Sequence, residues 1–286
     1  MTIPAIGLVL LAAIVHAGWN ALAKQRQDIL AFFWALTLTA LVLYAPLFAV
    51  IVSREPPHRS VLPYLIASSL AEAAYYVFLA RAYQTSELSL VYPVARGMGI
   101  LLVPLLSLAI FAERPSPSAW TGIIMVLGGI IWLHVPAFRA AWRTRPLRSV
   151  ISPPAVLTGG AIAAYSLIDS KGVQHAHPIV YLYLVFVLIV LWLAPHVLRQ
   201  RRAALAREWQ QRWPVLAGGA AVFGTYALIL AAFRLAPAAY VVPMREVSIV
   251  FGSWIGVHLL GEPFGWARLS ACCVVVAGVI AIGVGG

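Results

Sequence analysis

Charged residues are scarce in this chain. They make up 10% of its 286 residues, and 9 residues are Asp or Glu. Water-soluble globular domains carry about a quarter charged residues, so the shortage excludes an ordinary soluble protein. Hydrophobic residues reach 62%. The composition therefore predicts an integral membrane protein.

Cysteine is nearly absent as well. Cys272 and Cys273 are neighbours inside an apolar run, where they build neither a disulfide framework nor a metal site. The sequence also lacks the glycine-rich phosphate loop, the His-Glu-x-x-His motif and the Gly-x-Ser-x-Gly motif. The pair His175 and His177 has no third ligand nearby in the sequence. We expect no enzyme activity, no metal and no cofactor.

Basic residues, by contrast, give the chain a net charge of +11. Most of the arginines lie in short segments between apolar runs, where membrane proteins place cations against anionic headgroups. This position excludes a nucleic-acid partner and predicts contact with membrane lipid.

Ten apolar runs of about twenty residues fill most of the chain, which is the length a helix needs to cross the hydrocarbon. They are Ile3–Ala23, Ala31–Val52, Val61–Tyr83, Leu88–Ala112, Ala119–Val135, Pro153–Gly172, Ile179–Leu198, Trp213–Leu235, Ala238–Leu260 and Trp266–Gly283. Because helices satisfy their own backbone in lipid, we predict an all-α protein with ten transmembrane helices. The first run lacks a preceding basic segment, which predicts a span and not a cleaved signal peptide.

The sequence is duplicated. Leu79–Pro93 aligns with Ile229–Pro243, and a one-residue shift then aligns Arg96 with Arg245. Each copy continues through apolar or small residues to a Glu-containing hairpin. Such a duplication in a hydrophobic chain is typical of transporters built from two repeats.

Five helices per repeat is an odd number, so the second repeat enters the membrane from the opposite side and the repeats are predicted to be inverted. The predicted domains are 1–138 for the first five-helix repeat, 139–152 for a basic connecting loop and 153–286 for the second repeat. Pro93 and Pro243 occupy the same place in both repeats. Each is predicted to break or bend its helix beside a cavity.

Two hairpins end the duplicated segments, Glu113-Arg114-Pro115 and Gly261-Glu262-Pro263, and the next helix contains Gly122 and Gly128-Gly129. With ten spans in inverted repeats, these motifs resemble the EamA type of the drug/metabolite transporter superfamily over nearly the whole chain. The first hairpin departs from the family pattern, with Phe111-Ala112 in place of Leu-Gly. The small size and the Trp- and Tyr-rich spans are similar to YddG-like amino-acid exporters. The resemblance implies a multi-pass transporter of the bacterial inner membrane.

Ionisable side chains within the predicted spans each need a partner, water or a ligand. They are Glu72, Arg81, Arg96, Arg245 and Glu246. An arginine fork binds a carboxylate bidentately, so we predict that Arg96 or Arg245 binds a substrate carboxylate and that Glu72 or Glu246 binds its ammonium group. The alternative is that these charges pair internally. Glu246 follows Arg245 directly, so on one helix the two would point about 100° apart.

Aromatic residues supply the walls of the predicted site, where they can hold an aromatic side chain. The predicted wall residues are Trp19, Tyr75, Tyr76, Tyr83 and Tyr240. Glu72 shares roughly one helix face with three of these tyrosines. Tyr226 is the repeat partner of Tyr76, whereas Val222 stands where a partner of Glu72 would be.

The candidates for coupling transport to an ion gradient are Glu72, Glu246 and His16. The imidazole is included because its ordinary pKa suits a proton relay, and Asn20 lies one helical turn from it. Gly252 and Gly256 have the spacing of a close helix contact.

These features predict a secondary transporter that works by alternating access and exports amino acids, including aromatic and other neutral ones. A porter of organic anions such as phosphonates or sugar phosphates is an alternative, because two arginines also suit a dianion. A non-transporting accessory membrane protein is another, and a central polar cavity that reaches one side would distinguish the two classes. We expect a monomer with a small-molecule substrate.

The distribution of cations predicts the orientation. The connections on the side of the termini hold Arg54, Arg59, Arg114, Lys171 and Arg234. The opposite connections hold Lys24, Arg26, Arg139, Arg143, Arg145, Arg148, Arg199, Arg201, Arg202, Arg207, Arg212 and Arg268. The richer side faces the cytoplasm by the positive-inside rule, which places both termini outside. The family resemblance implies termini inside, and we follow the cation count.

Overall fold

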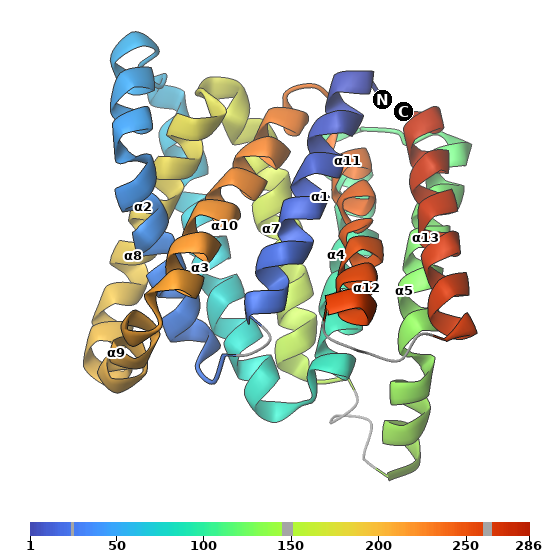
Figure 1. The fold of residues 1–286 in the computed structure, drawn as a ribbon. Coiled ribbons are helices and arrows are strands. Elements are labelled where there is room, and N and C mark those ends of the chain that lie inside the picture. Colours follow the sequence, from blue (N-terminus) through green and yellow to red (C-terminus); the bar gives the residue numbers. More distant parts are fainter. Residues whose placement is uncertain (24–25, 145–150, 260–264) are drawn as a thin grey trace.

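The computed structural model describes residues 1–23, 26–144, 151–259 and 265–286, and these parts form a helical bundle without strands (Figure 1). The helices are α1 (Ile3–Ala23), α2 (Ile29–Arg54), α3 (Leu62–Thr85), α4 (Leu88–Phe111), α5 (Pro117–Thr144), α7 (Pro153–Gly172), α8 (Pro178–Gln200), α9 (Arg202–Gln210), α10 (Arg212–Phe233), α11 (Ala238–Arg245), α12 (Ser248–Leu259) and α13 (Trp266–Gly285). Two 3₁₀ turns, η1 (Arg59–Val61) and η2 (Val173–His175), precede α3 and α8.

Eight of these helices are long and apolar enough to cross a membrane, namely α1, α2, α3, α4, α5, α8, α10 and α13. The all-α membrane fold is therefore confirmed. The predicted count of ten helices is not confirmed, because the run Ala238–Leu260 is divided into α11 and α12, two residues after the break predicted at Pro243. In addition, the basic connection between α8 and α10 contains α9, which the hydrophobic pattern does not predict.

The break between α11 and α12 is a tight turn. Glu246 and Val247 donate their N–H groups to the carbonyls of Pro243 and Met244, three residues back, at 3.2 and 3.1 Å. The first repeat behaves differently, since α4 continues from Leu88 to Phe111 through Pro93. The predicted break at Pro93 is therefore wrong.

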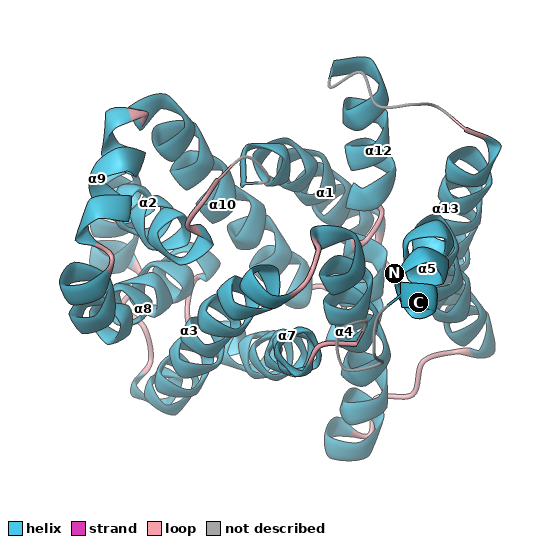
Figure 2. Cartoon of the chain, turned by 90° about the horizontal axis from the view of Figure 1, so that it is seen from below, coloured by secondary structure: helices cyan, strands magenta, loops and turns pink. Residues whose placement is uncertain are grey.

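The packing of the helices relates the two halves of the chain. Helix α1 of the first half packs on α10 and α12 of the second half. In the same way, α7 of the second half packs on α3 and α4 of the first half (Figure 2). When each helix is replaced by its counterpart in the other repeat, the neighbours of α1 become the neighbours of α7. The contact of α2 with α10 likewise becomes the contact of α8 with α3. Helices α5 and α13 pack against each other, and both termini lie at one end of the bundle (Figure 1).

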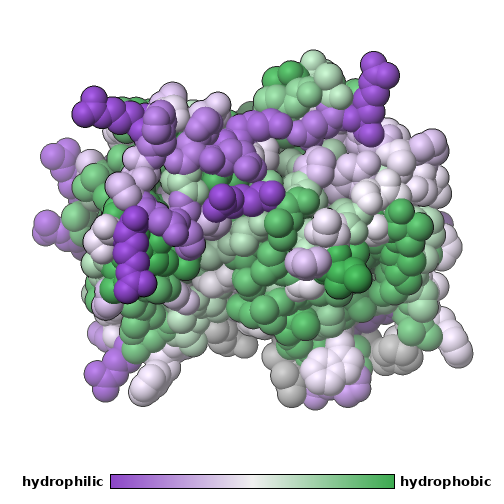
Figure 3. Space-filling model, turned by 90° about the horizontal axis from the view of Figure 1, so that it is seen from above, coloured by the Kyte–Doolittle hydropathy of each residue, from purple (hydrophilic) through white to green (hydrophobic). Residues whose placement is uncertain are grey.

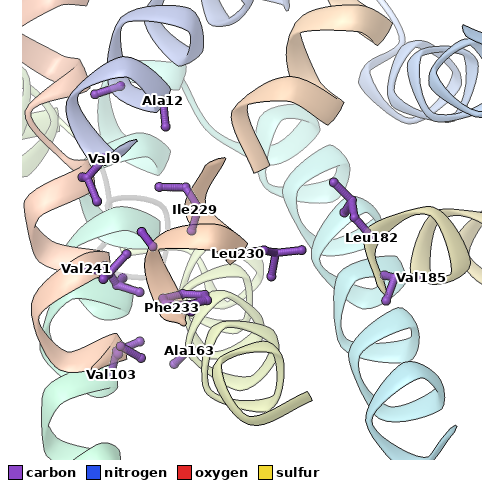
Figure 4. Packing of buried hydrophobic residues seen from close by; sticks show 14 of the residues in the cluster. Val9, Ala12, Val103, Ala163, Leu182, Val185, Ile229, Leu230, Phe233 and Val241 are labelled. Atoms are coloured by element: carbon purple, nitrogen blue, oxygen red, sulfur yellow. The ribbon is translucent and has the colours of Figure 1, made fainter. Parts of the chain in front are cut away.

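The core draws apolar residues from both halves. Figure 4 shows Val9 of α1, Val103 of α4 and Val241 of α11 in one region, with Leu182 and Val185 of α8 beyond Leu230. All of these side chains are buried. On the face seen from above, polar side chains gather over one side while apolar side chains reach the surface elsewhere (Figure 3).

Glycine brings α5 and α13 into backbone contact. A Cβ atom at Gly278 would lie 2.7 Å from the carbonyl oxygen of Gly122, and one at Gly129 would lie 3.0 Å from the carbonyl oxygen of Ala271. Such spacing leaves no room for a side chain between the helices. The close contact predicted at Gly252 is not found, because a Cβ there would meet nothing within 4 Å.

The hairpin after α4 uses a left-handed residue. Ala112 caps α4 with φ 54° and ψ 22°, at the place where the family pattern has glycine. The next residue, Glu113, accepts a hydrogen bond from Ser107 and pairs with Lys171 of α7 at 2.7 Å. The corresponding Gly261, Glu262 and Pro263 of the second repeat lie outside the described residues.

Replacing Ala112 by glycine is expected to stabilise the protein by about 1 kcal/mol, because a left-handed conformation costs about that much for a residue with a Cβ. Thermal unfolding in detergent measures the change. Ala227→Gly, in the middle of α10, is the matched control and should instead destabilise by about 0.5–1 kcal/mol. An unchanged or lower melting temperature for Ala112→Gly would contradict the prediction.

Polar contacts between side chains are present at both ends of the bundle. At the end with the termini, the Ser60 hydroxyl and Nδ1 of His175 lie 3.0 Å apart and join η1 to η2. At the opposite end, Arg201 pairs with Asp28 at 2.7 Å, and Arg26 lies 3.7 Å from Glu208 of α9. Burial raises the pKa of the Glu208 carboxyl, and Arg26 opposes that shift.

Candidate binding site in the central cavity

A cavity of about 580 Å³ opens at the end of the bundle opposite the termini. It is lined by the end of α1, the start of α2, the second half of α3 and the start of α4, with Thr158 and Ile162 of α7. Its mouth includes Arg26 and Glu87. The cavity therefore opens on the side with more cations.

A smaller pocket of about 70 Å³ continues the cavity into the centre of the bundle. Phe33, Tyr75 and Arg96 line both spaces. The further residues that line the inner pocket are His16, Trp19, Leu36, Glu72, Tyr76, Tyr165, Phe186, Val222, Thr225, Tyr226, Ile229 and Arg245. We call this space the inner pocket. It brings together residues of both repeats.

Arg96 contacts two neighbouring side chains with its guanidinium. Its Nη1 lies 3.2 Å from Oε1 of Glu246, and its Nη2 lies 2.8 Å from Nε2 of His16. Because a guanidinium only donates, His16 must accept at Nε2, and its imidazole is neutral in this arrangement. Asn20 lies 3.1 Å from the same nitrogen.

Arg245 has unused donors. Its Nε lies 3.7 Å from Oε1 of Glu246, which is too long for a hydrogen bond. Nε and Nη2 are buried and have no hydrogen-bond partner among the described residues. The same holds for Oε1 of Glu72 and for Oε2 of Glu246. Arg245 and Glu72 line the same pocket, so it offers one cation and one anion with free hydrogen-bonding capacity.

The contact between Arg245 and Glu246 corrects the sequence interpretation, which placed them on different faces of one helix. The helix ends at Arg245, and Glu246 lies in the turn before α12. The turn lets one carboxylate reach both Arg96 and Arg245.

Aromatic rings form a continuous wall in the inner pocket. Tyr75 contacts Tyr76 and Tyr165 with ring centroids 5.8 Å apart in each pair. Tyr165 in turn lies 5.9 Å from Tyr226. The ring of Trp19 meets His16 edge to face at 5.0 Å.

Three predicted residues lie away from the inner pocket. Tyr83 lines the outer cavity near its mouth. Tyr240 lies toward the termini, where its hydroxyl accepts a hydrogen bond from the N–H of Ser116 at 3.2 Å, and it lines neither space. Arg81 is exposed near the end of α3. The structure therefore places Tyr240 outside the two lined spaces. It also places Arg81 outside the group of buried charges.

Sequence reasoning misses one buried acid. Asp169 of α7 is 0% exposed. It accepts hydrogen bonds from the hydroxyls of Tyr181, at 2.8 Å, and of Tyr226. Since Tyr226 also lines the inner pocket, Asp169 stands directly behind the pocket wall.

Fold and cavity define a multi-pass membrane protein with a polar binding space that is open at one end. The model of the EamA-like transporter family matches residues 3–135 and 154–284. The chain belongs to the EamA-like transporter family, whose members move small molecules across membranes. The two matched segments correspond to the two halves of the duplication.

A solved structure described as "Crystal structure of protein" is similar to this chain with a TM-score of 0.75. The match covers 98% of this chain and 97% of that one at 17% sequence identity, so it shows a shared fold alone. Among curated proteins, none matches the sequence.

Proposed function

We propose that this protein is a secondary transporter of the bacterial inner membrane that exports amino acids, including aromatic and other neutral ones. The main observation in support of this proposal is the inner pocket, in which Arg245 has free hydrogen-bond donors and Glu72 has a free acceptor. A zwitterion satisfies both, with its carboxylate on the guanidinium of Arg245 and its ammonium on Glu72. The tyrosine wall and the adjoining outer cavity accept the side chain.

The same contacts weigh against an organic dianion. Two free arginines would suit a phosphonate or a sugar phosphate, but Arg96 already donates to Glu246 and His16. Only Arg245 of this pair keeps buried donors without a partner among the described residues. An accessory protein with purely internal ion pairs is disfavoured by a cavity that reaches one end of the bundle.

The test is transport by the purified protein in liposomes loaded with unlabelled substrate, with labelled L-phenylalanine compared against a labelled sugar phosphate. Phenylpropionate lacks the ammonium group and phenethylamine lacks the carboxylate, so both should compete at least tenfold more weakly than L-phenylalanine. Uptake of the phosphate alone would favour the anion porter. Uptake of neither would favour the accessory protein.

The orientation that the cations predict turns the described cavity toward the cytoplasm. The cavity opens on the cation-rich end, so the positive-inside rule places its mouth in the cytoplasm and both termini outside. A phosphatase fused after Gly286 is expected to be active, and a fluorescent protein fused there to stay dark. A fluorescent fusion with an inactive phosphatase would reverse the orientation and turn the described cavity toward the outside.

A further inference from the structure

The contact between α3 and α7 buries an acid on each helix, Glu72 and Asp169. With Glu246, they give the buried centre one carboxylate more than its two guanidiniums, Arg96 and Arg245. Glu246 lies beside both arginines, and Glu72 shares the inner pocket with Arg245. Asp169 neither lies beside an arginine nor lines this pocket among the described residues.

The surroundings of Asp169 are phenolic. Its hydrogen-bond partners in the described parts of the chain are Tyr181 of α8 and Tyr226 of α10, and no basic side chain there is within ion-pair distance. Lys171, two residues further along α7, pairs with Glu113 instead. The other titratable or charged groups on the elements packed against α7 are Tyr64, Glu72, Tyr75, Tyr76, Arg81 and Tyr83 of α3, Tyr92 and Arg96 of α4, Arg212 of α10, Tyr240 and Arg245 of α11, and His175 of η2, with Tyr165 on α7 itself.

This setting suits a carboxyl group that exchanges a proton. Both phenols donate to Asp169, which supports an ionised carboxylate that has no cation beside it inside the bundle. A neutral carboxylic acid can instead donate to one phenol and accept from the other, so the same two partners serve both protonation states.

We propose that Asp169 carries the coupling proton of the transporter and that Tyr226 connects it to the substrate site. This inference rests on the proposed function. Tyr226 contacts Asp169 through its hydroxyl, and its side chain lines the inner pocket together with Glu72 and Arg245. A substrate ammonium at Glu72 brings a positive charge to the α3–α7 contact, and this charge favours the ionised form of Asp169. Substrate binding therefore releases the proton, and one proton moves against each substrate.

The proton site is tested first without any substrate, by infrared difference spectra of the purified protein over a pH titration. The band of a protonated carboxylic acid is expected in the wild type and in the matched control Glu72→Gln, and its loss is expected in Asp169→Asn. Tyr226→Phe keeps the carboxyl and removes one hydrogen bond, so it should shift the band. A band that persists in Asp169→Asn, or that disappears in Glu72→Gln, overturns the proposal.

The coupling is tested by calorimetry of L-phenylalanine binding in two buffers of different ionisation enthalpy. The wild type should release about one proton per bound substrate and Asp169→Asn none. In liposomes, Asp169→Asn should exchange substrate downhill and lose its response to a pH gradient. Binding without proton release in the wild type, or a requirement for Na⁺ at constant pH, overturns the proposal even if Asp169→Asn does not accumulate. If no amino acid binds at all, the proposed function fails, while the infrared band still decides whether Asp169 holds a proton.

Discussion

Arg245→Lys is expected to weaken substrate binding by about 1.5–3 kcal/mol, roughly 10- to 150-fold, while the protein accumulates normally. Lysine keeps the positive charge of Arg245 but loses the planar fork, whose Nε and Nη2 are the buried donors without a partner in the described structure. The change is measured as the dissociation constant of L-phenylalanine in detergent and as the half-saturating concentration in liposomes.

The matched control for this substitution is Arg81→Lys. Arg81 is also an arginine of the bundle, but its side chain is exposed near the end of α3, so its replacement should leave binding unchanged. Normal binding by Arg245→Lys would remove Arg245 from the substrate site. A variant that binds normally when folded but accumulates poorly would make Arg245 a structural residue.

Glu246→Gln is expected to produce the largest loss of stability, about 3–5 kcal/mol, because it leaves two buried guanidiniums without their carboxylate. Glu246 is 1% exposed and lies 3.2 Å from Arg96 and 3.7 Å from Arg245. Thermal unfolding in detergent measures the loss. Glu55→Gln, at an exposed residue after α2, should change the melting temperature little.

A second substitution separates the ion pair from other effects of Glu246. When Arg96→Met is added to Glu246→Gln, one of the two stranded charges is removed, and part of the lost stability should return. Strictly additive losses in the double variant would show that the contact between Arg96 and Glu246 is not what stabilises the fold.

Much of the fold can be predicted from the sequence because the lipid environment restricts the structures that a hydrophobic run can form. Runs long enough to cross the hydrocarbon must be helical, and the duplicated segment from Leu79 reveals the two halves. The run from Ala238 divides just after Pro243, where the repeated proline predicts a break, but the buried contact of Arg245 with Glu246 at this point is not predicted. The hydrophobic pattern contains no sign of that contact. It also does not predict α9, because α9 is a short helix of mainly polar and small residues.

The candidate site could be predicted in part. Glu72, Arg96 and Arg245 stand out because a charge within an apolar run is costly, and the structure brings all three to the inner pocket. Asp169 lies three residues before the end of its run and two residues before Lys171, so it resembles a residue at the membrane surface. Its burial results from the packing of α3 on α7, and phenols of α8 and α10 donate hydrogen bonds to it. Those neighbours come from other helices, and the pattern of α7 contains no sign of them.

The interruption between α11 and α12 also changes the electrostatics of the buried charges. Arg245 is the last residue of α11, beside backbone carbonyls that carry a partial negative charge, and Glu246 stands two residues before Ser248, where the N–H groups of α12 carry a partial positive charge. Each ion therefore lies at the helix end of opposite sign. The negative end of the α11 dipole and the positive end of the α12 dipole therefore meet at this ion pair. Inside the bilayer they replace part of the solvation that water would otherwise provide.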